Sequence, residues 1–255
     1  MPEQRRWVVE RAARPDPVAT LYCFPHAGGA AGEFVRWAAE LPRLRVAAVQ
    51  PPGRAHQLGE HAFTAMAPLV DAVLAGVRFV EPFALFGHSL GALVAFEVAK
   101  SLRAHRGITP VRLFVSSCTA PPLPVSRAPL HLLDDRELHA EIERRWGPLP
   151  AAVRADDRLL SAALACYRAD FAVLETHEHV PDTPLGCPIT AFVGDGERGG
   201  AQRMLGWGAH TAKTFDLCQR PGGHFHVRDG VGELCRLIDH TVTTDVHPTH
   251  LRMST

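Results

Sequence analysis

The sequence Phe-Ala-Leu-Phe-Gly-His-Ser-Leu-Gly-Ala-Leu-Val-Ala-Phe at positions 83–96 decides the fold of this chain. Its apolar first part has the character of a buried strand, and its last part has that of a helix. Only small residues fit beside so sharp a turn from strand to helix, which explains Gly87 and Gly91. Such a turn holds the residue at its apex in a strained, exposed conformation. The sequence therefore predicts that Ser89 is a nucleophile.

Strand-like segments alternate with helix-like segments along most of the chain. The predicted strands lie at residues 19–24, 46–49, 83–86, 112–117, 188–194 and 215–218. Between them, segments such as 64–79 carry apolar residues at helical spacing. Strands that are separated by helices form a parallel sheet with helices on both faces. We therefore expect an α/β fold with a mostly parallel, doubly wound sheet.

The region from about 120 to 185 interrupts this alternation, because it has helical patterns and prolines but no convincing strand. Asp134 begins one predicted helix as its N-cap, and a second helix is expected at about 157–176. A helical insertion here is most simply a lid that covers the nucleophile and excludes water. We expect one domain with a core at about 1–119 and 186–255 and a helical lid at about 120–185. A purely structural role for these helices is the alternative.

Composition excludes several classes of function. The chain has 255 residues, with 27 basic and 27 acidic side chains, so its formal net charge is zero. This balance gives no basic footprint for nucleic acid or for an anionic membrane. No apolar stretch approaches the roughly 20 residues of a membrane span, and the N-terminus lacks the apolar segment of a secretory signal. We expect a cytoplasmic protein that binds neither nucleic acid nor membrane.

The cysteines and histidines give no signal for a metal. The six cysteines are scattered without a C-x-x-C pair, which is typical of free thiols in a cytosolic protein. Two H-x-H pairs occur among the fifteen histidines, at 177–179 and 224–226. Neither pair has a third ligand at a structured spacing, so we expect no metal site.

A serine nucleophile requires a general base. The segment around Ser89 resembles the nucleophile elbow of the α/β-hydrolases, in which an acid and then a histidine follow the serine in chain order. His224 lies after the last predicted strand, in a loop whose paired glycines allow it to turn back toward the serine. His226 is the rival, but in an extended segment it points the opposite way. We expect His224 to be the base.

The acid that orients the histidine is expected in the loop 194–198, after the strand that precedes it. From the residues alone, either Asp195 or Glu197 could reach the imidazole. The oxyanion that forms during the reaction requires two backbone N–H groups. We expect these from Leu90, which follows the nucleophile, and from Ala27, in the loop after the first predicted strand.

Several motifs occur together in a specific order. They are Phe24-Pro25-His26-Ala27-Gly28-Gly29, Pro52-Gly53-Arg54, Gly87-His88-Ser89-Leu90-Gly91-Ala92, Tyr167-Arg168-Ala169-Asp170-Phe171, Cys187-Pro188-Ile189-Thr190 and Pro221-Gly222-Gly223-His224-Phe225. With them the chain resembles the type II thioesterases, the discrete enzymes that accompany modular polyketide synthases and nonribosomal peptide synthetases. The resemblance runs from about Leu21 to Val227.

The resemblance implies an α/β-hydrolase fold and hydrolysis of acyl thioesters from the phosphopantetheine arm of an acyl or peptidyl carrier protein. Short or aberrant acyl groups that block an assembly line would be the substrates. No cofactor is implied for this chain, because the phosphopantetheine belongs to the partner, and the family suggests a monomer. The family's acid loop usually reads G-D-x-D-P, with the second carboxylate in the triad. This places the acid at Glu197.

Two positions depart from the family pattern. Arg198 stands where proline usually follows the acid, and Gln57 stands where P-G-R-x-x-R usually carries arginine, a position suggestive of partner or substrate contacts. Other functions also fit the residues. A carboxylesterase or lipase acting on free esters would use the same triad, and an acyltransferase would release the acyl group to an acceptor other than water. A catalytically weak carrier-protein binder is the alternative from another class.

Overall fold

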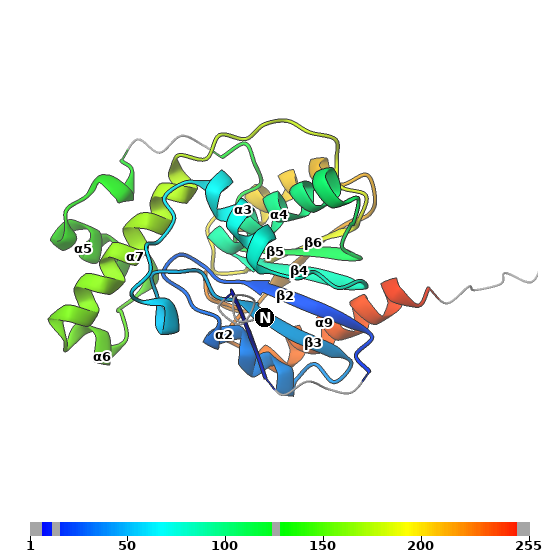
Figure 1. Cartoon of the computed structure of the whole chain (residues 1–255), viewed down its shortest axis with the longest axis horizontal. Coiled ribbons are helices and arrows are strands. Elements are labelled where there is room, and N and C mark those ends of the chain that lie inside the picture. The colour runs from blue at the N-terminus through cyan, green and yellow to red at the C-terminus, as the bar shows by residue number, and fades with distance from the viewer. Residues whose placement is uncertain (1–6, 12–15, 124–127, 249–255) are drawn as a thin grey trace, which may run out of the picture.

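The structure is a computed structural model that describes residues 7–11, 16–123 and 128–248 (Figure 1). A seven-stranded sheet runs through it in the order β1-β3-β2-β4-β5-β6-β7. The strands are β1 (Val8–Glu10), β2 (Ala19–Phe24), β3 (Leu44–Val49), β4 (Phe83–His88), β5 (Arg112–Ser116), β6 (Ile189–Gly194) and β7 (Phe215–Arg220). Only the β1–β3 pair is antiparallel. The predicted α/β class and mostly parallel sheet are confirmed, and the edge strand β1 was not predicted.

Helices cover both faces of this sheet. They are α2 (Gly32–Val35), α3 (Met66–Gly76), α4 (Leu90–Arg106), α5 (Asp135–Trp146), α6 (Ala151–Arg154), α7 (Asp157–Glu175), α8 (Gly200–Met204) and α9 (Val231–Val246), with short 3₁₀ turns between some of them. Along β2, Tyr22 and Phe24 face the cluster that contains α3 and α4, whereas Leu21 and Cys23 face the cluster that contains α2 and α9. This alternation is what a strand buried on both faces requires.

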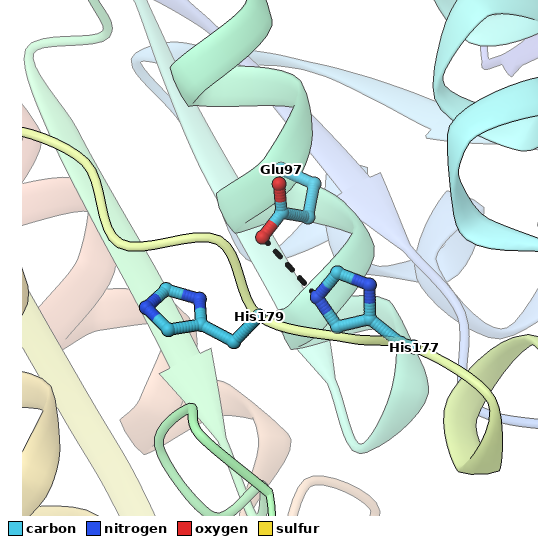
Figure 2. Close-up of side chains that lie close together, drawn as sticks. All are labelled: Glu97, His177 and His179. Carbon is cyan, nitrogen blue, oxygen red and sulfur yellow. Dashed lines mark ion pairs between the residues drawn. The ribbon is translucent and has the colours of Figure 1, made fainter.

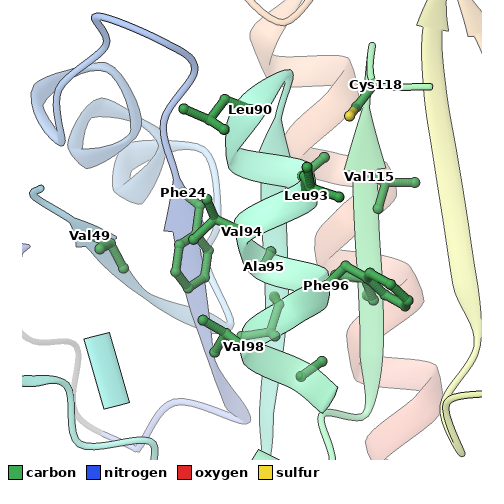
Figure 3. Close-up of a cluster of buried hydrophobic side chains, with 14 of the residues drawn as sticks. Phe24, Val49, Leu90, Leu93, Val94, Ala95, Phe96, Val98, Val115 and Cys118 are labelled. Carbon is green, nitrogen blue, oxygen red and sulfur yellow. The ribbon is translucent and has the colours of Figure 1, made fainter. Parts of the chain in front are cut away.

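The core beneath Ser89 lies between α4 and the centre of the sheet (Figure 3). Leu93 and Phe96 of α4 pack toward β5 and Val115, while Val94 lies toward Phe24 of β2. All five side chains are buried. The start of α4, which follows Ser89 directly, is therefore held on a rigid part of the molecule.

Helices α5, α6 and α7 form a group beside the end of the sheet, drawn in green to yellow-green at the left of Figure 1. Asp134 caps α5 as predicted, since its carboxylate accepts a 2.8 Å hydrogen bond from the Glu137 N–H. Asp156 caps α7 in the same way, with bonds from the N–H groups of Arg158 and Leu159. Residues 120–123 and 128–184 contain no strand. None of the helices in the described residues is both long and apolar enough to cross a membrane.

Candidate active site

Ser89 sits at the apex of the turn between β4 and α4. Its φ of 54° and ψ of −123° lie outside the regions that ordinary residues prefer, which is the strain expected of a nucleophile elbow. A Cβ on Gly87 would lie 2.1 Å from the Gly91 carbonyl oxygen, and one on Gly91 would lie 2.2 Å from the Phe24 carbonyl oxygen. Both positions therefore require glycine. The Ser89 N–H donates a 2.7 Å hydrogen bond to the Ser116 carbonyl on β5, which fixes the turn.

The loops that follow β6 and β7 bring Glu197 and His224 together. They approach so closely that a Cβ on Gly194 would lie 2.3 Å from the Gly223 carbonyl oxygen. Glu197 Oε2 then lies 3.5 Å from His224 Nδ1. The other Glu197 oxygen accepts a short hydrogen bond from the Ser117 hydroxyl, a partner that the sequence patterns did not indicate.

These contacts keep Glu197 ionised. Burial by itself raises the pKa of this carboxyl, but the hydrogen bonds from His224 and Ser117 outweigh it and lower the pKa to about 2. The carboxylate is thus negative throughout the neutral range and faces the Nδ1 side of the imidazole. A carboxylate in this place holds the ring so that the other nitrogen, Nε2, can accept a proton.

Asp195 has a different role in the structure. It is exposed, and its Oδ1 accepts a 3.1 Å hydrogen bond from the N–H of Gly222, in the loop that carries His224. Its own N–H donates to the Arg220 carbonyl at 2.8 Å. Asp195 therefore joins two neighbouring loops.

Glu197→Gln is expected to lower kcat more than Asp195→Asn does. The first change removes the charge that fixes the imidazole tautomer, at a cost of roughly 10³–10⁴-fold in kcat. The second keeps a side-chain oxygen that can accept from Gly222, so its loss in kcat should stay within about tenfold. Steady-state hydrolysis of one small thioester by both variants measures the ranking, and the reverse ranking would assign the acid to Asp195.

A second serine–histidine pair lies inside the protein. The hydroxyl of Ser116 is 3.1 Å from Nε2 of His226 and 2.9 Å from Nδ1 of His88. All three residues have no exposed surface. Burial lowers the pKa of His226 to about 4 and that of His88 well below its ordinary value, so both rings are neutral. A substrate has no access to this pair. Because the Ser116 carbonyl also accepts the hydrogen bond from the Ser89 N–H, the pair is placed to support the turn at Ser89.

The loop after β2 lies where a second oxyanion donor would be needed. Ala27 lines the same cavity as Ser89 and His224. No acceptor for its N–H occurs among the residues that the structure describes. The Leu90 N–H is the first of α4 and has no acceptor within the helix. Both predicted donors are therefore available to a ligand.

A buried ion pair fixes this loop to α7. Arg54 makes a two-pronged contact with the Asp170 carboxylate, at 2.6 and 2.7 Å, and both side chains are more than nine-tenths buried. Asp170 also accepts from the Gly28 N–H at 2.7 Å, and Arg54 donates to the Gly29 carbonyl at 3.2 Å. The motifs at 24–29, 52–54 and 167–171 thus form one cluster. All three motifs stand out in the sequence, but none of them indicates a role for Asp170.

Gln57, one of the two departures from the family pattern, is also internal. Its side chain is buried and donates a 2.8 Å hydrogen bond to the Gln50 carbonyl. It therefore supports the loop that carries Arg54.

Two cavities meet at Ser89. The first has a volume of about 520 Å³ and extends between the sheet and the helices α5 to α7. It is lined by Ser89 and His224 and by apolar side chains that include Trp146, Leu149 and Phe171. The second has a volume of about 560 Å³, lies along the ends of α7 and β5, and has the more polar lining Ser117, Thr119 and Thr176 beside Ser89. Ser89 is thus accessible from two directions.

Comparisons with known proteins agree with this geometry. The family model of the thioesterase domain matches residues 19–242. The gramicidin S biosynthesis protein GrsT of Aneurinibacillus migulanus is 34% identical over 233 residues, which cover 90% of this chain and 91% of the relative. Thioesterase PikA5 of Streptomyces venezuelae is 37% identical over 247 residues, which cover 93% of this chain and 86% of the relative.

Solved structures show the same similarity. The type II thioesterase BorB from the borrelidin biosynthetic cluster superposes with a TM-score of 0.83 at 34% identity, covering 92% of this chain and 97% of that one. RedJ, a thioesterase of the prodiginine pathway in Streptomyces coelicolor, gives a TM-score of 0.79 at 35% identity, covering 91% and 96%.

Proposed function

Because the chain belongs to the thioesterase family and is a type II thioesterase with the α/β-hydrolase fold, we propose that Ser89, His224 and Glu197 are its catalytic triad. The assignment rests on one observation. Ser89 and His224 line one cavity, and an ionised Glu197 lies 3.5 Å from the far side of the same imidazole. Asp195 makes its contacts elsewhere.

In the proposed reaction, His224 Nε2 takes the proton of Ser89 as Oγ attacks the thioester carbonyl carbon. The N–H groups of Leu90 and Ala27 hold the oxyanion. When the intermediate collapses, the C–S bond breaks and the imidazolium returns its proton to the departing sulfur. His224 then activates a water molecule that attacks the acyl-enzyme, and the carboxylic acid leaves. Glu197 holds the imidazole in the required tautomer throughout.

The substrate we propose is an acyl group on the phosphopantetheine arm of a carrier protein from a polyketide or nonribosomal peptide assembly line. Two relatives support this proposal, since GrsT is named for gramicidin S biosynthesis and BorB for the borrelidin cluster. Type II thioesterases act on such carrier-bound acyl thioesters. The apolar side chains that α5 to α7 contribute to the larger cavity, Trp146 and Phe171 among them, suit the acyl group. We propose that these helices act as the lid of the site.

A comparison of substrates tests this function. The ratio of kcat/KM between a propionyl-loaded carrier protein and p-nitrophenyl propionate should favour the carrier-bound thioester by at least about 100-fold, because only the carrier-bound substrate gains binding energy away from the reacting bond. A ratio near one would favour a general esterase. Binding of the loaded carrier without turnover of either substrate would favour a carrier-protein binder.

Arg144 and Arg145, at the end of α5, are our candidates for contact with an acidic carrier protein. Both pair with Glu141, and Arg145 also lines the larger cavity. Charge reversal of Arg144 to glutamate, which leaves the lining of the larger cavity unchanged, is expected to raise KM for the carrier-bound substrate about tenfold, because charges at the rim of an interface mainly affect association. KM for a small thioester should not change.

Arg236→Glu, an exposed charge reversal on α9 on another side of the molecule, provides the matched control. The docking interpretation would be wrong if the α5 variant raised KM equally for both substrates. It would also be wrong if Arg236→Glu had the same effect on the carrier-bound substrate.

A further inference from the structure

The H-x-H pair at 177–179 has a third partner that comes from a different part of the fold. His177 and His179 lie in the segment that follows α7, and this segment crosses α4 beside Glu97 (Figure 2). One nitrogen of each histidine and one oxygen of Glu97 lie within 4.8 Å of one another. The sequence spacing did not indicate this third ligand, because 80 residues separate Glu97 from His177 (177 − 97).

The distances fit a tetrahedral ion. His177 Nε2 lies 3.4 Å from Glu97 Oε1. Ligands bound to zinc at about 2.0–2.1 Å with tetrahedral angles are separated by about 3.3 Å. Two of the three ligand atoms therefore already have the separation that such an ion imposes. The third has to approach by no more than about 1.5 Å, which a side-chain rotation on an irregular segment can provide.

The cluster includes nitrogen atoms that are buried without a well-directed hydrogen bond. The His177 side chain is only 9% exposed, and that of Glu97 is 13% exposed. His177 Nε2 and His179 Nδ1 are both buried, and neither makes a well-directed hydrogen bond. A buried nitrogen without a partner, such as His179 Nδ1, is costly, and a cation bound to it would remove the cost.

Lys100 is the competitor for this position. Its ammonium group lies 2.9 and 3.2 Å from the two oxygens of Glu97 and 5.3 Å from the centre of the Phe96 ring. Without a metal, the Lys100 ammonium group neutralises the carboxylate. A metal ion would have to displace this ammonium group from Glu97.

We propose that Glu97, His177 and His179 bind a divalent transition-metal ion of the zinc type, with water in the fourth position. Two imidazole nitrogens and one carboxylate oxygen favour zinc and its neighbours over magnesium or calcium, which prefer oxygen ligands alone. The ion would attach the segment that follows α7 to α4, the helix that begins directly after the nucleophile. It would thereby fix one end of the helical region without a part in the chemical step.

Zinc titration of the metal-free, reduced protein tests the proposal by calorimetry, and cobalt substitution reports the geometry by absorption. We expect one equivalent to bind, with the strong visible bands of tetrahedral Co²⁺. The double variant His177→Ala/His179→Ala should weaken binding by more than about 100-fold. His240→Ala, an exposed histidine on α9, is the matched control and should bind as the wild type does.

Lys100→Met is expected to strengthen zinc binding, whereas the double histidine variant weakens it. It removes the ammonium that competes for Glu97 and keeps an unbranched side chain against Phe96, so zinc affinity should rise several-fold. Three outcomes would overturn the proposal. They are the absence of saturable binding, an unchanged affinity in the double histidine variant, and weaker binding in Lys100→Met. The last would mean that the metal does not take the place of the ammonium at Glu97.

Discussion

Ser89→Ala is expected to lower kcat for thioester hydrolysis by roughly 10⁴–10⁶-fold, the range found when a triad nucleophile is removed. Alanine leaves the elbow with no atom that can form the acyl-enzyme. The oxyanion donors and the binding cavity remain, so a small rate above that in water should persist. The expected pattern is a large loss in kcat with a KM close to that of the wild type, measured on a small thioester.

Ser116→Ala is the matched control, because Ser116 also lies 3.1 Å from a histidine. That pair has no exposed surface, so its loss removes only internal hydrogen bonds. The variant should keep kcat within about tenfold of the wild type and lose about 1–3 kcal/mol of stability. If Ser116→Ala were inactive and Ser89→Ala active, the nucleophile would have been assigned to the wrong serine.

The second large effect is expected from Asp170→Ala. This change leaves the buried Arg54 guanidinium without its partner and the Gly28 N–H without its acceptor. A guanidinium group stays protonated in proteins even when it is buried, so the charge of Arg54 remains when its partner is removed. Breaking a buried pair in this way costs about 3–5 kcal/mol of unfolding free energy. Urea denaturation measures the loss.

Two further variants separate stability from function. Arg168→Ala, on the same helix, breaks a solvent-exposed pair with Asp135 and should cost no more than about 1 kcal/mol. Arg54→Met/Asp170→Leu replaces the buried pair by apolar side chains and should recover most of the stability. The kcat of this double variant should nevertheless lie below that of the wild type, because the loop that carries Ala27 has lost its attachment to α7. A loss below about 1 kcal/mol in Asp170→Ala would contradict this role of the ion pair.

The features of the fold that depend on local sequence could be predicted. The elbow at 87–91 combines a strand, two glycines and a helix within one short segment, and six of the seven strands in the described residues contain short apolar stretches near turn residues. The strand β1 was missed because three residues are too short for a periodic pattern. Its pairing with β3 depends on a distant segment of the chain, which periodicity does not report.

In the candidate site, too, motifs predicted some residues and left others open. Ser89 and His224 could be placed by motif and chain order, but the sequence alone left Asp195 and Glu197 as alternatives. They differ by two positions, and only the three-dimensional arrangement directs one toward His224 and the other toward Gly222. Arg54 and Asp170 are 116 residues apart, so no pattern of sequence spacing predicts their ion pair.

The proposed hydrolysis of carrier-bound acyl groups by Ser89 can be followed by the intact mass of a propionyl-loaded carrier protein after incubation with the wild-type enzyme and with Ser89→Ala. We predict that the carrier loses the mass of the propionyl group with the wild type and retains it with the variant. A carrier that keeps its acyl group in both incubations, or loses it equally in both, would contradict the account.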